Sequence, residues 1–320
     1  MSTSELIFSA QRNSFRFGGP LLIAIGSIGC ILNLMVFTKD TLRKSPCTIC
    51  FVAVNIIDFI YFYTGLLITT LASGYDIDPS IRSVTFCRVR YYVGYVLSSW
   101  EASYIILAAI DRTLVTSRNA ATRKLSTRRL VSVSIICIAV FWLLFHIHTL
   151  IFMQILQYGP SYFVCYYQPG TYTTIMAFYM VLVNGILPPL LMGILGLWTV
   201  RNIRRVNRGV RPDSLTNTGI MVIGRPRILR SKDQQLIRML FVNIISYIIF
   251  KFPLTIFLVY TQITLNKEKS AEQNIIESSI VQLTYFWYYF DNGISCYTNL
   301  IVSKTFRTEL KRILLNANRF

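Results

Sequence analysis

The chain has 320 residues, of which 53% are hydrophobic and only 14% are charged. These values exclude an ordinary soluble domain and indicate a protein with several membrane spans. The formal net charge of +18 would suit a nucleic-acid partner, but the basic residues cluster in segments between apolar ones. That alternation predicts a membrane topology and excludes a nucleic-acid-binding surface.

Seven apolar segments are each long enough to cross the roughly 30 Å hydrocarbon core of a bilayer as a helix. They cover residues 18–38, 47–72, 84–115, 130–154, 172–199, 236–263 and 279–302. Most Lys and Arg residues lie in the loops after the first, third and fifth segments and in the tail. Because basic loops stay in the cytoplasm, this pattern predicts a multi-pass protein with its N-terminus outside.

The chain therefore divides into an extracellular N-terminus (1–17), a seven-span domain (18–302) and a cytoplasmic tail (303–320). The N-terminal segment lacks the apolar core of a cleavable signal peptide, so the first span is expected to direct its own insertion. In the tail, Phe306 and Leu310 recur at helical spacing among basic residues. This pattern predicts an amphipathic helix at the inner membrane surface, in contact with lipid.

Of the seven cysteines, only Cys87 and Cys165 fall on the expected outer side. Two cysteines in an oxidising compartment predict a disulfide, which would tie the loop 155–171 to the third span. The alternative is a pair of free outer thiols.

Several landmark residues recur in the order and spacing of a known receptor family. They are Asn33, Asp58, Asp111, Arg112, Trp142, Pro188 (or Pro189) and Pro253. With seven spans and the outer cysteines, the chain resembles a rhodopsin-like (class A) G-protein-coupled receptor, and its general appearance resembles invertebrate neuropeptide receptors. The resemblance implies an all-α seven-helix membrane bundle at the plasma membrane. It also implies an extracellular ligand and a heterotrimeric G protein as partners, and no enzymatic activity.

The resemblance implies a switch at the inner face. In the family, the arginine matched by Arg112, next to Asp111, pairs with an acid at the inner end of the sixth span, here Asp233. Release of that pair would open a groove for a G-protein helix. Pro188 and Pro253 are candidate helix hinges. The alternatives are that Asp233 is a solvated charge and that the prolines only shape packing.

Lys251 stands where the family usually has a tryptophan, and a lysine inside a span implies a partner or a function. The predicted interior polar cluster consists of Asn33, Asp58, Glu101, Lys251 and Asp291. In the family register Asp58 and Glu101 surround an interior sodium ion, with Asp291 nearby. We expect Lys251 to pair with Asp291 or Glu101 and to replace much of the sodium's role, so that no other cofactor or metal is needed. The alternative is that Lys251 reaches a water-filled pocket without a fixed partner.

The seventh span reads Ser295-Cys296-Tyr297-Thr298-Asn299 where the family has Asn-Pro-x-x-Tyr. The proline kink and the inner tyrosine are both missing, which leaves open a receptor-like protein that couples weakly. The four buried charges could also form the ion path of a transporter, but no internal repeat supports that reading.

The resemblance excludes two ligand classes, because Gly94 replaces the aspartate of amine receptors and Tyr289 replaces the retinal-binding lysine. Aromatic residues crowd the outer half instead. The candidate ligand pocket consists of Tyr91, Tyr95, Tyr166, Tyr167, Tyr285, Tyr288 and Tyr289. Aromatic walls with few polar anchors suit a peptide. The alternatives are an interfacial aromatic belt and a non-peptide ligand.

No HExxH, GxSxG or glycine-rich phosphate loop occurs in the sequence, so no enzyme class is indicated. His146 and His148 are two residues apart. They are expected to point to different faces of the fourth span, so they could not form an i, i+4 metal-binding pair. We expect them to form hydrogen bonds between helices or to face water.

Overall fold

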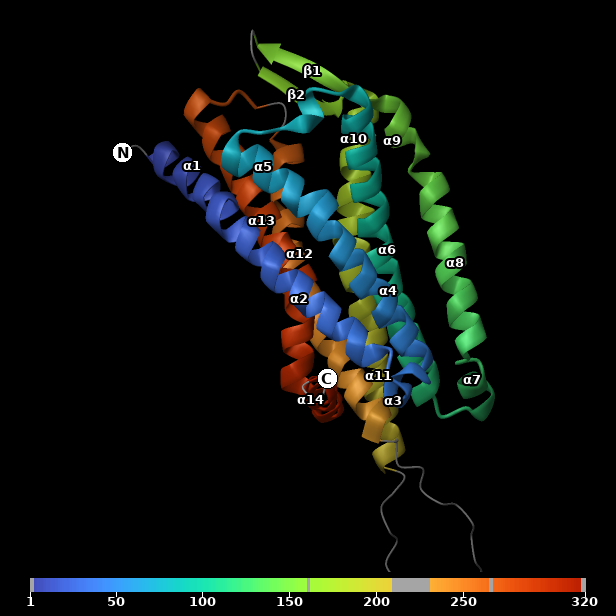
Figure 1. Ribbon diagram of the computed structural model, residues 1–320. Coiled ribbons are helices and arrows are strands. Elements are labelled where there is room, and N and C mark those ends of the chain that lie inside the picture. The colour runs from blue at the N-terminus through green and yellow to red at the C-terminus, as the bar shows by residue number, and fades with distance from the viewer. Residues whose placement is uncertain (1–2, 160–161, 209–230, 265–266, 318–320) are drawn as a thin grey trace, which may run out of the picture.

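The computed structural model describes residues 3–159, 162–208, 231–264 and 267–317. The chain forms a bundle of long helices, with a β-hairpin over one end and the short helix α14 at the other (Figure 1). The N-terminus lies towards the hairpin end and the C-terminus lies at the opposite end. The predicted all-α, seven-helix class is confirmed.

The seven spans are built from helical segments, three of them with an inserted turn of π-helix. They are α1 (Thr3–Asn13), a π-turn (Ser14–Gly18) and α2 (Gly19–Phe37); α4 (Pro46–Tyr61), a π-turn (Phe62–Leu66) and α5 (Leu67–Tyr75); α6 (Val84–Thr116); α8 (Arg128–Phe145) and α9 (Ile147–Phe152); α10 (Thr171–Tyr179), a π-turn (Met180–Ile186) and α11 (Leu187–Arg208); α12 (Ser231–Ile263); and α13 (Ala271–Val302). The connecting elements are α3 (Asp40–Arg43), a 3₁₀ turn (Pro79–Ile81), α7 (Ala120–Lys124), β1 (Met153–Gly159), β2 (Tyr162–Tyr167) and α14 (Lys304–Ala317).

Within the described residues, six of the spans are long and apolar enough to cross a membrane, and α13 completes the bundle. The helix α13 is less apolar because it carries Glu272, Glu277 and Asp291. The first helix begins at Thr3 and therefore extends beyond the predicted start of the first span at residue 18. Its first turns are held against α5, since Arg12 pairs with Asp76 and Tyr75 donates to the Arg16 carbonyl.

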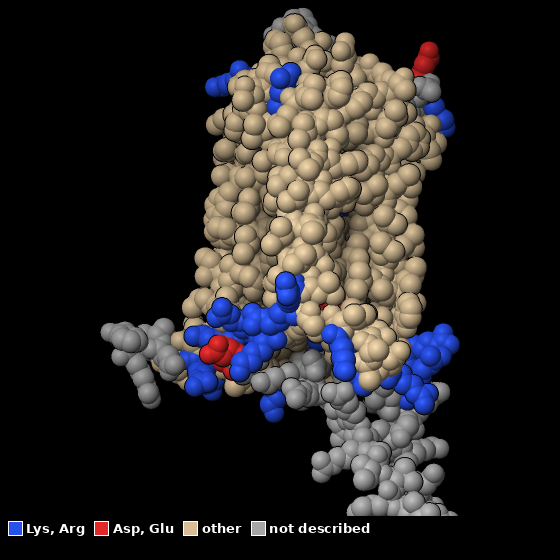
Figure 2. Space-filling model, turned by 90° about the vertical axis from the view of Figure 1, so that its right-hand side faces the viewer, with Lys and Arg blue, Asp and Glu red and all other residues tan. Residues whose placement is uncertain are grey.

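The two ends of the bundle differ in charge. In Figure 2, Lys and Arg side chains surround the end that carries α14, whereas the middle band is almost free of surface charge. A few basic and acidic side chains mark the opposite end in that view. The uncharged band matches the apolar zone that a bilayer requires around a membrane bundle.

Glycine permits the close approach of the first two spans. A Cβ atom on Gly26 would lie 2.3 Å from the ring of Phe62, which is itself fully buried. Real Cβ atoms do not come that close, so Gly26→Ala must push the ring or the helix aside.

We expect Gly26→Ala to destabilise the fold by about 1–3 kcal/mol, the usual cost of overpacking a core. Gly193→Ala is the matched control, because its added Cβ meets no atom within 4 Å. That control should be neutral or slightly stabilising, since alanine favours helix over glycine. Thermal unfolding of both variants in detergent measures the difference, and equal midpoints would contradict the steric argument.

The two predicted hinge prolines each free a carbonyl, because proline cannot donate to the residue four positions earlier. For Pro188 that carbonyl belongs to Asn184, and the Tyr247 hydroxyl donates to it over 3.1 Å. For Pro253 the freed carbonyl belongs to Ile249, and Trp287 Nε1 donates to it over 3.2 Å. Side chains of neighbouring helices therefore satisfy both helix breaks, as a membrane interior requires.

We expect Tyr247→Phe to destabilise the bundle by about 1–3 kcal/mol, because the Asn184 carbonyl, which Pro188 leaves without a helical donor, then loses the Tyr247 hydroxyl as well. Tyr104→Phe is the matched control, because it also removes one tyrosine hydroxyl. Its hydroxyl donates to the Ile135 carbonyl of α8 at 3.2 Å, which already accepts a helical hydrogen bond. Thermal unfolding should therefore shift less for Tyr104→Phe, and the reverse order would contradict the proline argument.

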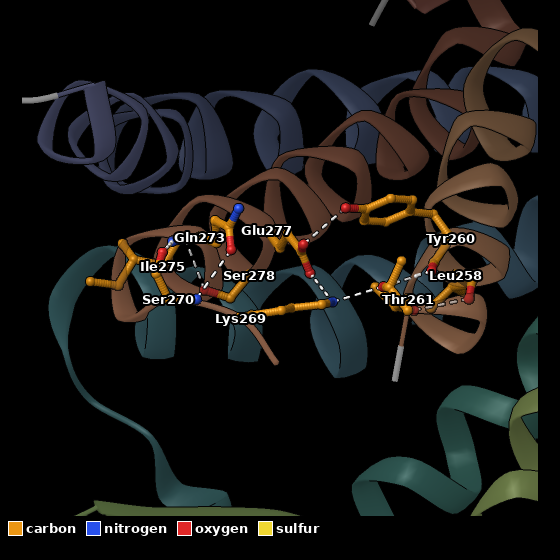
Figure 3. A network of polar contacts seen from close by, with 10 residues as sticks. Leu258, Tyr260, Thr261, Lys269, Ser270, Gln273, Ile275, Glu277 and Ser278 are labelled. Carbon is orange, nitrogen blue, oxygen red and sulfur yellow. Dashed lines mark hydrogen bonds and ion pairs between the residues drawn. The ribbon is translucent and has the colours of Figure 1, made fainter. Parts of the chain in front are cut away.

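The loop between α12 and α13 is fastened to both helices (Figure 3). Lys269 donates to Glu277 at 2.5 Å and to Thr264 at 2.7 Å, and Tyr260 donates to Glu277 at 3.0 Å. Ser270 and Gln273 form a reciprocal capping box that starts α13. These contacts fix the outer ends of two helices next to each other.

The hydrogen bond from Lys269 lowers the pKa of the Glu277 carboxyl. A carboxyl whose folded pKa is depressed adds stability above its unfolded pKa of about 4.3, and this is lost as the pH falls through the folded value. We expect a small acid-side loss of thermal stability that Glu277→Gln abolishes. The effect is small because the pair lies near the surface. An unchanged pH profile in Glu277→Gln would contradict it.

Candidate functional site

A cavity of about 430 Å³ lies in the half of the bundle next to the β-hairpin. All seven tyrosines predicted to form the pocket line it, together with Tyr61. They come from the second, third and seventh spans and from strand β2. The other lining residues include Thr64, Thr69, Arg90, Ser98, Asn184, Lys251, Gln262 and Gln282. The cavity therefore combines aromatic walls with a limited set of polar groups, as small-molecule and peptide sites do.

Two of the three π-turns lie at this cavity. The turn in the second span places Thr64 and Gly65 on the wall, and the turn in the fifth span places Met180 and Asn184 there. A π-turn inserts one residue and widens the helix locally, a feature frequent at functional sites. A Cβ on Gly65 would lie only 3.0 Å from the Tyr289 hydroxyl, so this position also gives that tyrosine its room.

The hairpin β1–β2 contributes to the cavity wall because a disulfide joins it to the third span. The Cys87–Cys165 bond, predicted from the sequence, is present, with a Cα–Cα distance of 5.8 Å. Tyr166 and Tyr167 follow Cys165 directly and line the cavity. Tyr167 is buried, and its hydroxyl donates to Thr149 over 3.4 Å.

Lys251 forms the deep end of the cavity. Its ammonium pairs with Glu101 and lies 3.4 Å from Asp291, so both candidate partners contact it. It also lies over two aromatic rings, 4.9 Å from the Tyr247 centroid and 4.5 Å from the Tyr288 centroid. Lysine 251 is 4% exposed. A desolvated ammonium is tolerated there because carboxylates and ring faces surround it.

Asp58 and Asn33, the two remaining members of the predicted polar cluster, form hydrogen bonds with Asn292 and Asn55. Neither of these two asparagines was predicted to belong to the cluster. Asn292 donates to Asp58 at 2.8 Å and to Glu101 at 3.5 Å, and thereby links the two acids. Asn33 donates to Asn55 at 2.6 Å and to Ser295 at 3.0 Å, in a separate group nearer the inner end. Asn292 and Asn55 could have been found from the sequence, since a polar residue inside a span predicts a partner.

The polar cluster does not fit a sodium ion. The oxygens of Glu101 and Asp291 face the Lys251 ammonium, and Asp58 accepts from an amide. An added cation would meet the ammonium within the same group of oxygens. Over the described ranges, no group of three or more His, Cys, Asp or Glu residues is arranged to hold a metal.

At the other end of α6, Arg112 is 1% exposed. It donates to Asp111 from Nη2 at 2.5 Å and to the Ser45 hydroxyl at 3.2 Å. Ser126 donates to the other Asp111 oxygen at 2.5 Å. The side chain of Asp233 lies outside the described residues, so the predicted Arg112–Asp233 contact stays a prediction.

The inner end of α12 is fixed through Gln235 instead. Its Oε1 accepts from the Ser303 hydroxyl at 3.0 Å and from the Thr305 backbone at 2.8 Å. Thr113, which takes the place of the family's tyrosine, shares a hydrogen bond of 2.9 Å with Thr199 of α11. The sixth span is thus joined to α14 through Gln235, and the third span to the fifth through Thr113 and Thr199.

The expectation that the two histidines point to different faces is wrong, whereas the expectation that they form hydrogen bonds between helices is confirmed. The helix breaks at His146, whose φ and ψ are −82° and 1°, so α8 ends before it and α9 begins after it. The rings of His146 and His148 lie 5.9 Å apart instead of on different faces. His146 shares a hydrogen bond of 3.1 Å with Ser99, and His148 one of 2.6 Å with Tyr172. Both act as polar links between helices.

Comparison with known proteins agrees with this architecture. The family described as 7 transmembrane receptor (rhodopsin family) matches residues 29–294. Among curated proteins, none matches the chain. Every residue that lines the cavity, from Tyr61 to Tyr289, lies within the matched region, as does the Asp111–Arg112 pair. The chain belongs to the rhodopsin family of seven-transmembrane receptors, a group of multi-pass membrane proteins that signal through G proteins.

Proposed function

We propose that the protein is a plasma-membrane receptor that binds an extracellular peptide in the outer cavity and activates a heterotrimeric G protein. The observation that carries the proposal is the position of the cavity. It lies at the end of the bundle that has the disulfide-anchored hairpin, away from the end surrounded by basic residues. Basic residues favour the cytoplasmic side, so the cavity and the N-terminus would face outside.

The inner end supplies the coupling part of the proposal. Arg112 and Asp111 lie where the third span meets the loop between α6 and α8, next to Ser45 and Ser126. Outward movement of α12 would expose this buried pair to a G-protein helix. Asp233 is proposed as the second partner of Arg112 in the closed state, and Pro188 and Pro253 as the hinges.

Lys251 takes the place of the interior sodium ion in this proposal. We expect the thermal stability of the purified receptor to be the same in sodium chloride as in choline chloride at equal ionic strength. The reason is that the ammonium already neutralises the oxygens that a sodium ion would need. A clear rise of the unfolding midpoint with sodium would contradict this.

The experiment that tests the function is nucleotide exchange by a panel of G proteins on vesicles that contain the receptor. A library of short peptides, with free and with amidated carboxyl ends, supplies the agonists. Exchange evoked by a peptide supports the proposal. Silence from every peptide with folded receptor in the vesicles would reject the proposal, in favour of a non-peptide ligand or of a receptor that couples weakly.

A second candidate is a receptor that binds ligand but couples weakly. It is favoured by the seventh span, where Tyr297 donates to the Ile25 carbonyl of α2 at 2.9 Å. That hydroxyl is engaged with the first span, and no tyrosine stands at Asn299, where the family has its inner tyrosine. Ligand binding without exchange, on any G protein of the panel, would establish this second candidate.

A further inference from the structure

Among the described residues, every charged side chain on the cavity wall is positive. Arg90 and Lys251 line the cavity, and no Asp or Glu does. A ligand amine would therefore meet two cations and no directly facing acid. In a partly desolvated site such charges act strongly, so the lining favours a ligand with a negative group.

Lys251 is not the anchor for that group. It already pairs with Glu101 and Asp291 and lies over the Tyr247 ring. A ligand acid at this depth would have to approach two buried carboxyl groups, and like charges repel.

Arg90 is the better candidate to bind a negative group of the ligand. Its Nη1 donates to the Ser80 hydroxyl at 2.6 Å and its Nη2 to the Thr69 hydroxyl at 3.2 Å. Its acid partner, Asp78, lies 3.5 Å away and is itself bound by Ser80. A guanidinium carries five N–H donors in a planar fork, so donors remain for a carboxylate. Two-point binding of that kind is stronger than bonds to neutral hydroxyls.

Gln282 on α13 indicates a second property of the ligand, an N–H donor. Its Oε1 has no hydrogen-bond partner and is covered by protein atoms, so the Gln282 side chain, which lines the cavity, must turn for a ligand to reach that oxygen. A buried acceptor without a donor calls for an explanation. A ligand N–H that donates to it would supply the missing bond, and the tyrosine rings nearby would cover the apolar body of the ligand.

Building on the receptor function above, we propose that the cavity binds the free carboxyl end of a short peptide or of a single acylated amino acid. Arg90 holds the carboxylate, and Gln282 accepts the amide N–H of the same ligand. Both ligand types share a carboxylate and an amide, and they differ in length. A simple organic acid lacks the N–H, and an amidated peptide lacks the acid.

The test measures ligand-induced rises of the unfolding midpoint of the purified receptor at millimolar probe concentration. The probes are the N-acetyl derivatives of the twenty amino acids and of mixed dipeptides, each as the free acid and as the primary amide. We expect one or more free acids to raise the midpoint while the matched amides do not. The stronger effect, of single residues or of dipeptides, identifies the ligand type. No shift with any acid, or equal shifts with acid and amide, would overturn the proposal.

Three variants test whether Arg90 binds the carboxylate of the ligand. Arg90→Gln should weaken binding of the effective acid by about 10- to 100-fold, as expected for loss of a charged hydrogen-bonded pair. Asp78→Asn should tighten binding, because it removes the competing acid and leaves the folding role of Asp78 largely intact. Arg82→Gln, an exposed neighbour outside the cavity, should change nothing. If Asp78→Asn weakens binding, or Arg82→Gln weakens it as much as Arg90→Gln, the assignment fails.

Gln282→Leu separates the N–H contact from the carboxylate contact. It should reduce the preference for the N-acetyl acid over the matched carboxylate without the amide, and leave the Arg90 dependence unchanged. These measurements use no G protein. Acid-selective binding without nucleotide exchange would keep this inference and reject the coupling proposal. Exchange evoked only by amidated peptides would keep the coupling proposal and reject this inference.

Discussion

Lys251→Met should destabilise the folded receptor by about 3–5 kcal/mol, the usual cost of removing one partner from a buried ion pair. The substitution keeps the length and most of the volume of the side chain but removes the charge. Glu101 and Asp291 then lose the ammonium that lies between them, and Asp58 lies close by through Asn292. Thermal unfolding in detergent, together with the yield of monodisperse protein, measures the loss.

Two control variants test whether the loss of stability comes from the buried charge. Lys269→Met removes an ammonium from a pair at the outer surface and should have a small effect. Adding Glu101→Gln to Lys251→Met removes one of the uncompensated acids and should restore part of the stability. A Lys251→Met variant as stable as the native receptor would show that the acids are neutral in the fold and that the ammonium has no structural role.

The same lysine shows how far the sequence could lead. Its position two residues before Pro253 indicated a buried cation, and the acids in other spans made Asp291 or Glu101 the expected partner. The sequence left open which acid pairs with it, because helix rotation decides that, and rotation depends on packing around all seven spans. The structure brings Glu101 and Asp291 to the same ammonium. Asp58 is reached only through Asn292.

Local backbone irregularity accounts for most of what the sequence could not show. The tyrosines of the pocket were found because aromatic residues gather in the outer parts of predicted spans. The π-turns that place Thr64 and Asn184 on the same wall carry no clear sequence signal, since they depend on how neighbouring helices pack. The break at His146 has the same origin, and it reverses the expected arrangement of two histidines. The helix that begins at Thr3 was not predicted, because residues 1–17 contain no long apolar segment. Contacts with α5 stabilise this helix.

Arg112→Ala should reduce agonist-driven nucleotide exchange to the level of vesicles without receptor. Arg112 has the largest fully buried side chain among the described residues. Its guanidinium lies between the Asp111 carboxylate and the Ser45 hydroxyl. Its removal leaves Asp111 with Ser126 as the hydroxyl donor. The inner surface that a G-protein helix would contact then loses its charged donor. We expect stability to fall as well, because a buried carboxylate loses its cation.

Because Arg112→Ala also lowers stability, the controls must separate loss of folded receptor from loss of nucleotide exchange. Exchange must be expressed per folded receptor, measured as the monodisperse fraction before reconstitution. Arg118→Ala removes an exposed arginine from the same inner loop and should leave exchange unchanged. Arg112→Lys keeps a positive charge but loses the planar fork, so it should retain stability better than exchange. If Arg112→Ala still evokes exchange at the native level per folded molecule, the receptor couples through other groups. The inner links made by Gln235 and Thr113 would then be the next residues to substitute.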